Sequence, residues 1–107
     1  MVNKSRPNGG SRDKKTRPSI IVNDDALGKL PLKVIVPLTD WKEHYSIAPW
    51  MVKIIPDKIN KLTKESAADC FQIRSVAEER LVKYVGYITP AMVEKIKISL
   101  KTVLGME

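Results

Sequence analysis

The sequence predicts an α+β fold, a small and strongly bent antiparallel β-barrel closed by one C-terminal amphipathic helix. Short β-branched runs between residues 19 and 88 are separated by proline, glycine and Asx residues, which is the pattern of short strands joined by turns. After residue 89, apolar side chains recur at steps of three and four, as on one face of a helix. The length of 107 residues suits one domain with a single hydrophobic core.

Positive charge is concentrated near the N-terminus. Residues 1–18 hold six of the 19 Lys and Arg residues and one acidic residue, a net charge of +5, whereas residues 19–107 hold 13 basic and 11 acidic residues. We therefore divide the chain into a basic N-terminal arm, residues 1–18, and one domain, residues 19–107. Such an arm suits a polyanionic partner such as nucleic acid. A tail that only aids solubility has the same composition.

The composition argues against several classes of protein. Cys70 is the one cysteine, which excludes an internal disulfide and fits a reducing cytosol. No apolar run approaches the roughly 20 residues that span a bilayer, and the first residues lack the apolar region of a secretory signal. One cysteine and one histidine, His44, give no ligand cluster. We therefore expect a cytoplasmic protein without membrane contact, metal or cofactor.

The first strand is expected over residues 19–23, directly after Arg17 and Pro18. Residues 1–16 have no strand or helix period and are expected to form a loop. Because proline favours an extended conformation of the residue before it, Arg17 is held at the entrance of the strand. A guanidinium fixed there could bind phosphate through its planar fork of donors. A solvated arginine at a strand entrance is the alternative.

The next two strands are delimited by a turn and by prolines. Residues 23–28 mark the turn, and we interpret their carboxylates as turn caps rather than an acid–base pair. The second strand is expected over residues 33–36 and should end, or reach a sheet edge, at Pro37. Thr39 then lies at a strand mouth, as Arg17 does. The third strand is expected over residues 50–55.

The loops on either side of the third strand are expected to be irregular. The first, residues 40–49, holds His44, which we interpret as a surface residue. Trp41, Tyr45 and Trp50 could stack on unpaired bases or pack at the rim of the core. The second loop, residues 57–68, is polar and turn-like.

The fourth strand is expected over residues 69–76. Strand alternation places Gln72 and Arg74 on one face and directs Phe71 and Ile73 into the core. The exposed pair would be suited to recognition or to plain solvation.

The fifth strand and the helix follow. The strand is expected over residues 83–88, with Gly86 allowing a bulge or a close backbone approach. Thr89 and Pro90 are a helix cap and a first helical residue, and Gly105 is a typical stop. The apolar stripe of this helix comprises Val93, Ile96, Leu100 and Val103.

Four segments, in this order along the chain, resemble the PemK/MazF family of bacterial toxins, which cleave RNA and belong to type II toxin–antitoxin pairs. They are Pro7-x-x-Gly10-Ser11-x-x-x-Lys15-Thr16-Arg17-Pro18, Val36-Pro37-Leu38-Thr39, Phe71-Gln72-Ile73-Arg74-Ser75-Val76, and Val85-Gly86 with the helix end Val103-Leu104-Gly105.

The resemblance implies an SH3-like barrel that acts as a homodimer and is neutralised by an antitoxin whose extended tail occupies the active groove. Arg17 and Thr39 match the family positions associated with cleavage. Gln72 and Arg74 match positions near the groove for single-stranded RNA. From the charge of the basic arm we add Lys14 and Lys15 as RNA-binding candidates.

Three departures from the family pattern stand out. Members usually begin with an Arg-Gly-Asp-aliphatic-Trp strand, whereas this chain starts near its end, so we expect a central strand to be missing and a sheet edge to be exposed. Arg12 stands where the family often has Glu, and Phe71 where many members have Asp. The missing strand and Arg12 favour the alternative of a truncated, inactive member that binds antitoxin or RNA without cutting, whereas the presence of Arg17 and Thr39 favours the enzyme.

The expected chemistry is metal-free RNA cleavage. The 2′-hydroxyl attacks the adjacent phosphate, and Arg17 stabilises the charge that develops there. Thr39 donates a hydrogen bond to a phosphate oxygen. The sequence shows no clear general base, and His44 is a fallback.

Overall fold

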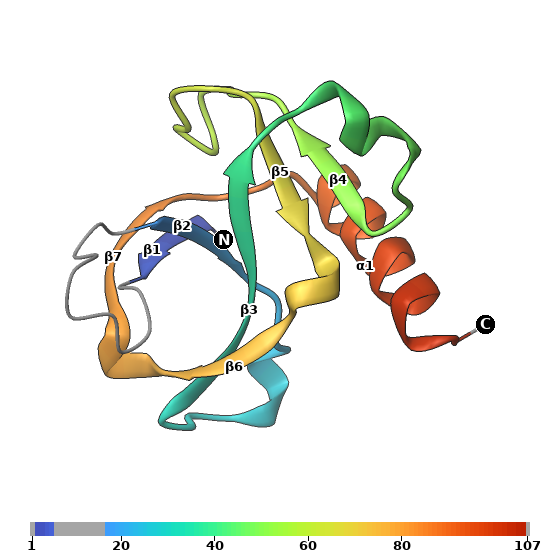
Figure 1. The fold of residues 1–107 in the computed structure, drawn as a ribbon. Helices are drawn as coiled ribbons and strands as arrows, with labels where there is room; N and C mark the ends of the chain where they lie inside the picture. The colour runs from blue at the N-terminus through green and yellow to red at the C-terminus, as the bar shows by residue number, and fades with distance from the viewer. Residues whose placement is uncertain (1, 6–16, 107) are drawn as a thin grey trace, which may run out of the picture.

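The computed structural model describes residues 2–5 and 17–106. In these residues the chain folds into antiparallel strands followed by one C-terminal helix (Figure 1). The strands are β1 (Val2–Ser5), β2 (Arg17–Ile21), β3 (Leu32–Asp40), β4 (Met51–Ile54), β5 (Ser66–Asp69), β6 (Arg74–Ala77) and β7 (Leu81–Gly86). The helix is α1 (Pro90–Leu104), and four short 3-10 segments are η1 (Asp25–Leu27), η2 (Glu43–Ile47), η3 (Cys70–Gln72) and η4 (Glu78–Arg80). The α+β class is confirmed.

Strand β3 is the centre of the sheet. One of its edges pairs with β2, and the other pairs first with β6 and then with β5 (Figure 1). The order along the sheet is β4-β5-β3-β2-β1-β7, with β6 attached to β3, and every pair is antiparallel. This order of the described strands is open, with β4 and β7 at its two ends.

Strand β1 corrects two expectations. Residues 2–5 were predicted to lie in a loop, and the central strand was predicted to be missing. Instead β1 lies between β2 and β7, with Val2 opposite Ile20 on one side and Gly86 on the other. The sheet edges of β2 and β7 are therefore paired at this position. Residues 2–5 are too few to show the alternation that is typical of a strand, so their structure depends on pairing with the neighbouring strands.

The second strand does not end at Pro37. Strand β3 continues to Asp40, which shortens the loop predicted over residues 40–49. Leu32–Ile35 pair with β6 and Leu38–Asp40 pair with β5. Pro37, which has no N–H to donate, lies in the interval where β3 changes partners, and it therefore disrupts neither ladder.

The strand predicted over residues 69–76 is instead two strands separated by a 3-10 turn. Residues Ser66–Asp69 form β5 and are buried, although residues 57–68 were predicted to be turn-like. Asp69 then accepts a hydrogen bond from the backbone N–H of Phe71 (3.2 Å) and starts η3. The side chain of Phe71 is 66% exposed, so its predicted core position is wrong. Ile73 packs against the core, as predicted.

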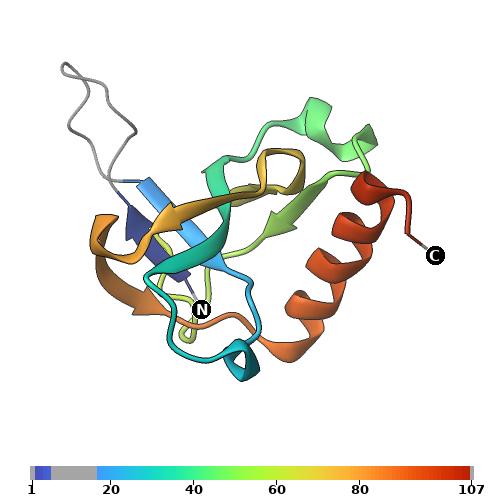
Figure 2. The same ribbon diagram turned by 90° about the horizontal axis from the view of Figure 1, so that it is seen from below.

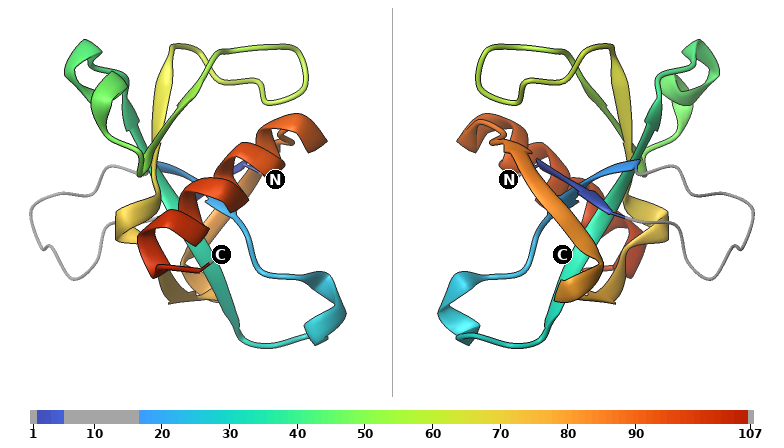
Figure 3. Two further views of the ribbon diagram at one scale, coloured as in Figure 1. Left: turned by 90° about the vertical axis from the view of Figure 1, so that its right-hand side faces the viewer. Right: turned by 90° about the vertical axis from the view of Figure 1, so that its left-hand side faces the viewer.

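The hydrophobic core lies between the sheet and α1 (Figures 2 and 3). Its buried members are Ile20, Val36, Leu38, Val52, Ile54, Ala68, Cys70 and Ile96. Leu100 and Val103 of the predicted helix stripe pack against this cluster, and Val93 is half-buried. Within residues 2–5 and 17–106, no helix is long and apolar enough to cross a membrane.

Both ends of α1 agree with the sequence. The Thr89 hydroxyl accepts a hydrogen bond from the backbone N–H of Met92 (3.3 Å), and Pro90 is the first helical residue. Gly105 adopts a left-handed conformation (φ 67°) and donates its N–H to the last turn of the helix. Such a conformation at a helix end favours glycine. Ser99, buried in the middle of α1, donates to the carbonyl oxygen of Pro49 (2.8 Å) and ties the helix to the loop before β4.

Candidate active site

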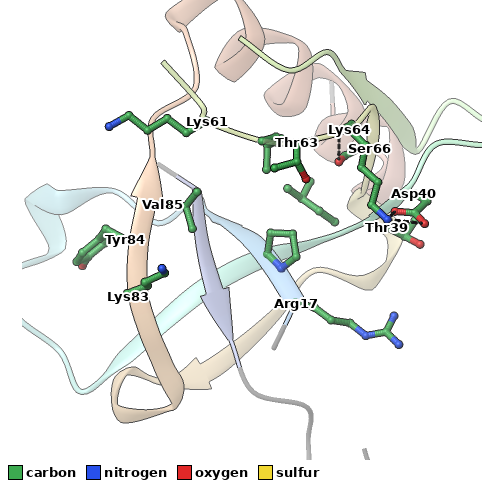
Figure 4. A pocket seen from close by; sticks show the side chains of 13 residues that line it. Arg17, Thr39, Asp40, Lys61, Thr63, Lys64, Ser66, Lys83, Tyr84 and Val85 are labelled. Carbon is green, nitrogen blue, oxygen red and sulfur yellow. Dashed lines mark hydrogen bonds and ion pairs between the residues drawn. The ribbon is translucent and has the colours of Figure 1, made fainter. Parts of the chain in front are cut away.

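A cleft of about 680 Å³ lies where the start of β2, the end of β3, the loop before β5 and the middle of β7 meet (Figure 4). Both residues that the sequence indicated for cleavage, Arg17 and Thr39, line it. The remaining lining residues are Pro18, Leu38, Asp40, Lys61, Leu62, Thr63, Lys64, Ser66, Lys83, Tyr84 and Val85. The cleft thus joins segments that are far apart in the sequence.

The pairing of β2 with β3 fixes where Arg17 and Thr39 lie. Ser19 is opposite Pro37 in this antiparallel pair. Two residues further toward the same end of the pair, β2 reaches Arg17 and β3 reaches Thr39. The two side chains therefore start from the same end of two neighbouring strands, just beyond the last residues that pair β2 with β3. Such a placement is more rigid than one on a loop.

The wall formed by residues 57–64 is held by polar contacts of two residues. Asn60 is buried; its Oδ1 accepts from the backbone N–H groups of Asp57 (3.1 Å) and Leu62 (2.9 Å), and its Nδ2 donates to the carbonyl oxygen of Ile55 (3.0 Å). The carboxylate of Asp57 accepts from the N–H groups of Ile59 (2.8 Å) and Asn60 (2.7 Å). This explains why a polar segment, predicted to be turn-like, is an ordered wall of the cleft.

This wall is packed against β7 at Gly86. A Cβ at Gly86 would collide with the carbonyl oxygen of Ile59 and would lie 2.8 Å from that of Asn60. The backbone N–H of Tyr87 donates to the same Ile59 oxygen (2.9 Å). The close backbone approach predicted for Gly86 is therefore confirmed. Lys61, next in the wall, has a left-handed backbone (φ 55°).

The charged side chains that line the cleft are mostly cationic. Among the described residues that line it, four side chains are cationic, those of Arg17, Lys61, Lys64 and Lys83, and one is a carboxylate, that of Asp40. Lys64 Nζ lies 3.2 Å from Asp40 Oδ1 and 3.4 Å from Oδ2. Figure 4 shows this pair beside Thr39, with Lys61 and Lys83 toward the β7 side. A surplus of positive charge in a hollow suits a polyanionic ligand.

Gln72 and Arg74, which were predicted to bind RNA, are not among the residues that line this cleft. Gln72 lies in η3 and donates from Nε2 to Asp69 Oδ2 (2.8 Å). Arg74 is exposed on β6, opposite Ile35. Lys14 and Lys15 lie outside the described residues, so their role stays a prediction.

Trp41, Tyr45, Trp50 and His44 are not among the residues that line the cleft. Trp41 and Tyr45 contact each other edge to face, with ring centroids 5.9 Å apart, and His44 lies 4.5 Å from Tyr45. Trp50 packs in the same manner on Phe71 (5.9 Å). These contacts favour the interpretation of the aromatic residues as rim packing. His44 is exposed in η2 and is not placed to serve as the fallback base.

Sequence reasoning missed Asp40, Lys61, Lys64 and Lys83. The signal that would have found two of them is the pairing of β3 with β5, in which Asp40 is opposite Ser66. The pairing continues by one further hydrogen bond, from the backbone N–H of Trp41 to the carbonyl oxygen of Glu65 (3.1 Å). Lys64, the residue before Glu65, therefore lies near Thr39 (Figure 4). Among the described residues, no three His, Cys, Asp or Glu side chains gather as metal ligands.

One family model matches nearly the whole chain. The model of the PemK-like, MazF-like toxin of type II toxin–antitoxin systems matches residues 1–104. No curated protein matches the chain.

Several solved structures share the fold. A Mycobacterium tuberculosis toxin, MazF-mt6, aligns with a TM-score of 0.80 at 15% identity, covering 99% of this chain and 97% of that one. An endoribonuclease in complex with its cognate antitoxin, from a mycobacterial species, aligns with a TM-score of 0.76 at 25% identity, covering 99% and 92%. A MazE–MazF structure from Deinococcus radiodurans gives 0.73 at 18% identity, covering 99% and 91%.

Proposed function

Since the chain belongs to the family of PemK-like, MazF-like toxins of type II toxin–antitoxin systems, we propose that it is a sequence-selective endoribonuclease toxin that cleaves single-stranded RNA. The observation that carries this proposal is the meeting of Arg17 and Thr39 in one cation-rich cleft. The relative at 25% identity is itself described as an endoribonuclease.

In the proposed reaction the 2′-hydroxyl of the RNA attacks the adjacent phosphorus, and the bond to the 5′-oxygen breaks. The products are a 2′,3′-cyclic phosphate and a 5′-hydroxyl. The guanidinium of Arg17 stabilises the extra negative charge on the phosphate oxygens, because a fixed cation is most effective where charge develops. The Thr39 hydroxyl donates a hydrogen bond to one of these oxygens and orients the phosphate.

The nucleophile in this scheme belongs to the substrate, so the reaction requires no metal-bound water. Cleavage is therefore expected to persist in EDTA. The test is denaturing-gel analysis of a mixed-sequence RNA and of a DNA of matching sequence. Cleavage of the RNA alone, with a cyclic phosphate at the new 3′ end, is the expected result. Equal cleavage of the DNA, or dependence on a divalent ion, would contradict the scheme.

The proposed partners are a cognate antitoxin and a second copy of the chain, in the cytoplasm. The relative at 25% identity was solved with its antitoxin, which supports the first. The homodimer follows from the family resemblance. Light scattering at micromolar concentration is expected to give twice the mass of the 12.1 kDa chain. A monomer that still unfolds cooperatively would count against the dimer.

The second candidate function is binding without cleavage. Arg12, where the family often has Glu, favours it because a groove carboxylate would be replaced by a cation. The exposed sheet edge that was expected from a missing strand no longer favours it, since β1 lies between β2 and β7 and pairs with both. A folded wild-type protein that binds RNA and antitoxin but leaves the RNA intact would establish this second function.

A further inference from the structure

The Asp40–Lys64 pair lies at the end of β3, next to Thr39, and lines the same cleft. RNA cleavage by a 2′-hydroxyl needs a group that accepts the hydroxyl proton and a group that protonates the leaving 5′-oxygen. Neither Arg17 nor Thr39 suits these tasks, because a guanidinium holds its proton too tightly and an unassisted hydroxyl is a poor base. Among the described residues that line the cleft, Asp40 is the one carboxylate.

We propose that Asp40 and Lys64 are the general base and the general acid of the cleavage reaction, an inference that rests on the proposed function. The Asp40 carboxylate takes the proton from the 2′-hydroxyl while the bond from O2′ to phosphorus forms. The Lys64 ammonium gives a proton to O5′ while the bond from phosphorus to O5′ breaks. Protonated Asp40 then returns its proton to Lys64 across the 3.2 Å contact, and both groups are restored without a further reactant.

The pairing of β3 with β5 places both groups beside Thr39. Asp40 is opposite Ser66 in the β3–β5 pair, and Thr39 is opposite Ala67. The Ser66 hydroxyl, which is buried, donates to the carbonyl oxygen of Lys64 (3.1 Å). Lys64 is therefore anchored at the edge of the sheet, although its side chain and that of Asp40 are 69% and 59% exposed.

Because both side chains are exposed, the Asp40–Lys64 pair contributes little to the stability of the fold. A salt bridge between two exposed side chains contributes about 0–1 kcal/mol at most to stability. The pair is thus of little use to the fold, yet it is the ion pair beside Thr39 in the cleft (Figure 4). Two open side chains can also exchange partners when a phosphodiester enters.

The elements next to the pair carry other charged groups. Those carried by the neighbouring elements are Arg17 on β2, Lys42 and Glu43 after β3, Lys53 on β4 and Glu65 before β5. Glu65 pairs with Lys53 (3.8 Å), and Lys53 lies 5.2 Å from the ring of Trp41. The Glu43 carboxylate accepts from Trp41 Nε1 (3.2 Å). The Lys53–Glu65 pair supplies a matched control, because it is also an ion pair with partly exposed side chains and Glu65 directly follows Lys64 in the sequence.

The first test is the pH dependence of single-turnover cleavage by wild type, Asp40→Asn, Asp40→Glu and the control Glu65→Gln. General acid–base groups typically contribute about 10²–10⁴-fold, so Asp40→Asn is expected to lose cleavage by that factor and to lose the acidic limb of the pH profile. The affinity of Asp40→Asn for an RNA with 2′-O-methyl groups, which cannot be cleaved, should differ from that of wild type by less than about threefold, or roughly 0.7 kcal/mol. Asp40→Glu should recover part of the rate, and Glu65→Gln should match wild type. Circular dichroism checks that each variant is folded.

The second test separates the acid from the base. A substrate with sulfur in place of the leaving 5′-oxygen needs no protonation of its leaving group. Lys64→Gln should cleave this substrate nearly as fast as wild type but should fail on ordinary RNA. Asp40→Asn should be slow on both. Equal defects of Lys64→Gln on the two substrates would remove Lys64 from the acid role.

The outcomes distinguish this inference from the proposed function. A wild-type protein that cuts RNA, together with a folded Asp40→Asn variant of equal rate and unchanged pH profile, overturns the inference alone. A wild-type protein that cuts no RNA overturns the proposed function and the inference together.

Discussion

Arg17 on β2 and Thr39 on β3 lie at the same end of the β2–β3 pair, each two residues beyond the Ser19–Pro37 pair that ends the ladder. The relation follows from strand register, so a one-residue slip would turn one side chain to the other face of the sheet. Pro18 stabilises the same arrangement, because it restricts the backbone of Arg17 to extended conformations. The candidate site is therefore built into the sheet, and only its second wall comes from a loop.

Replacing Gly86 by alanine is expected to destabilise the protein by at least about 1–3 kcal/mol, the usual cost of overpacking. The new methyl group would meet the carbonyl oxygens of Ile59 and Asn60, which are backbone atoms and cannot rotate away. Urea unfolding followed by circular dichroism measures the change. Gly105→Ala is the control: its left-handed backbone costs about 1–2 kcal/mol in strain, but the added Cβ meets nothing within 4 Å. A Gly86→Ala variant as stable as wild type would contradict the packing of this wall.

The thiol of Cys70 is expected to react slowly in the folded protein. Burial raises the pKa of Cys70; the nearby Asp69 charge adds to this increase, and a hydrogen bond with Ser99 opposes it. Since the thiolate is the reactive form, an aromatic disulfide reagent at pH 8 should modify the native protein far more slowly than the urea-unfolded chain. Equal rates in the two states would show that Cys70 is accessible.

The same shift predicts a loss of stability at alkaline pH. Above about pH 8.5 the unfolded chain begins to lose the thiol proton while the folded protein retains it. Unfolding then releases a proton, so the free energy of unfolding falls as the pH rises further. Cys70→Ala should lack this component of the pH dependence. An identical alkaline slope for wild type and Cys70→Ala would contradict it.

The sequence was most informative where structure is determined locally. The helix from Thr89 to Gly105 was predicted with both ends because its caps and apolar stripe lie within the segment itself. Gly86 was expected to allow a bulge or a close backbone approach, because glycine inside a strand pattern commonly marks one of the two. The strand over residues 69–76 was wrong because the Asp69 carboxylate competes for the backbone and starts a turn there.

Features fixed by distant partners could not be predicted. Strand β1 is defined by pairing with β2 and β7, and the passage of β3 through Pro37 depends on where β5 and β6 begin. The same holds for the site. Arg17 and Thr39 were selected through resemblance, but the proximity of Lys64 to Asp40 depends on the β3–β5 pair, which periodicity did not reveal.

RNA affinity is expected to depend strongly on salt. If the basic arm binds about four phosphates, the logarithm of the affinity should fall with the logarithm of the salt concentration with a slope near −3. The triple variant Arg12→Gln, Lys14→Gln, Lys15→Gln should have a shallower slope, by roughly 0.7 for each phosphate that is no longer neutralised. Charge substitution is preferable to deleting residues 1–14, because deletion would also remove β1.

The control for this experiment is Lys101→Gln, a change of one exposed cation on α1, far along the chain from the arm. It should leave the slope within experimental error of wild type. A wild-type slope near zero, or a triple variant that binds as wild type does at every salt concentration, would remove the arm from RNA binding.

The most direct test of the account is the rate of RNA cleavage by Arg17→Ala relative to wild type, with Thr39→Val as the graded comparison. Loss of a preorganised charge-stabilising donor typically costs about 3–4 kcal/mol, so Arg17→Ala should be slower by roughly a hundredfold to a thousandfold. Thr39→Val keeps the shape without the hydroxyl and should lose less, about tenfold to a hundredfold on the same scale. Both side chains line the cleft rather than the core, so circular dichroism should show unchanged folding. A folded Arg17→Ala variant that cleaves RNA at the wild-type rate would contradict the assignment of the active site.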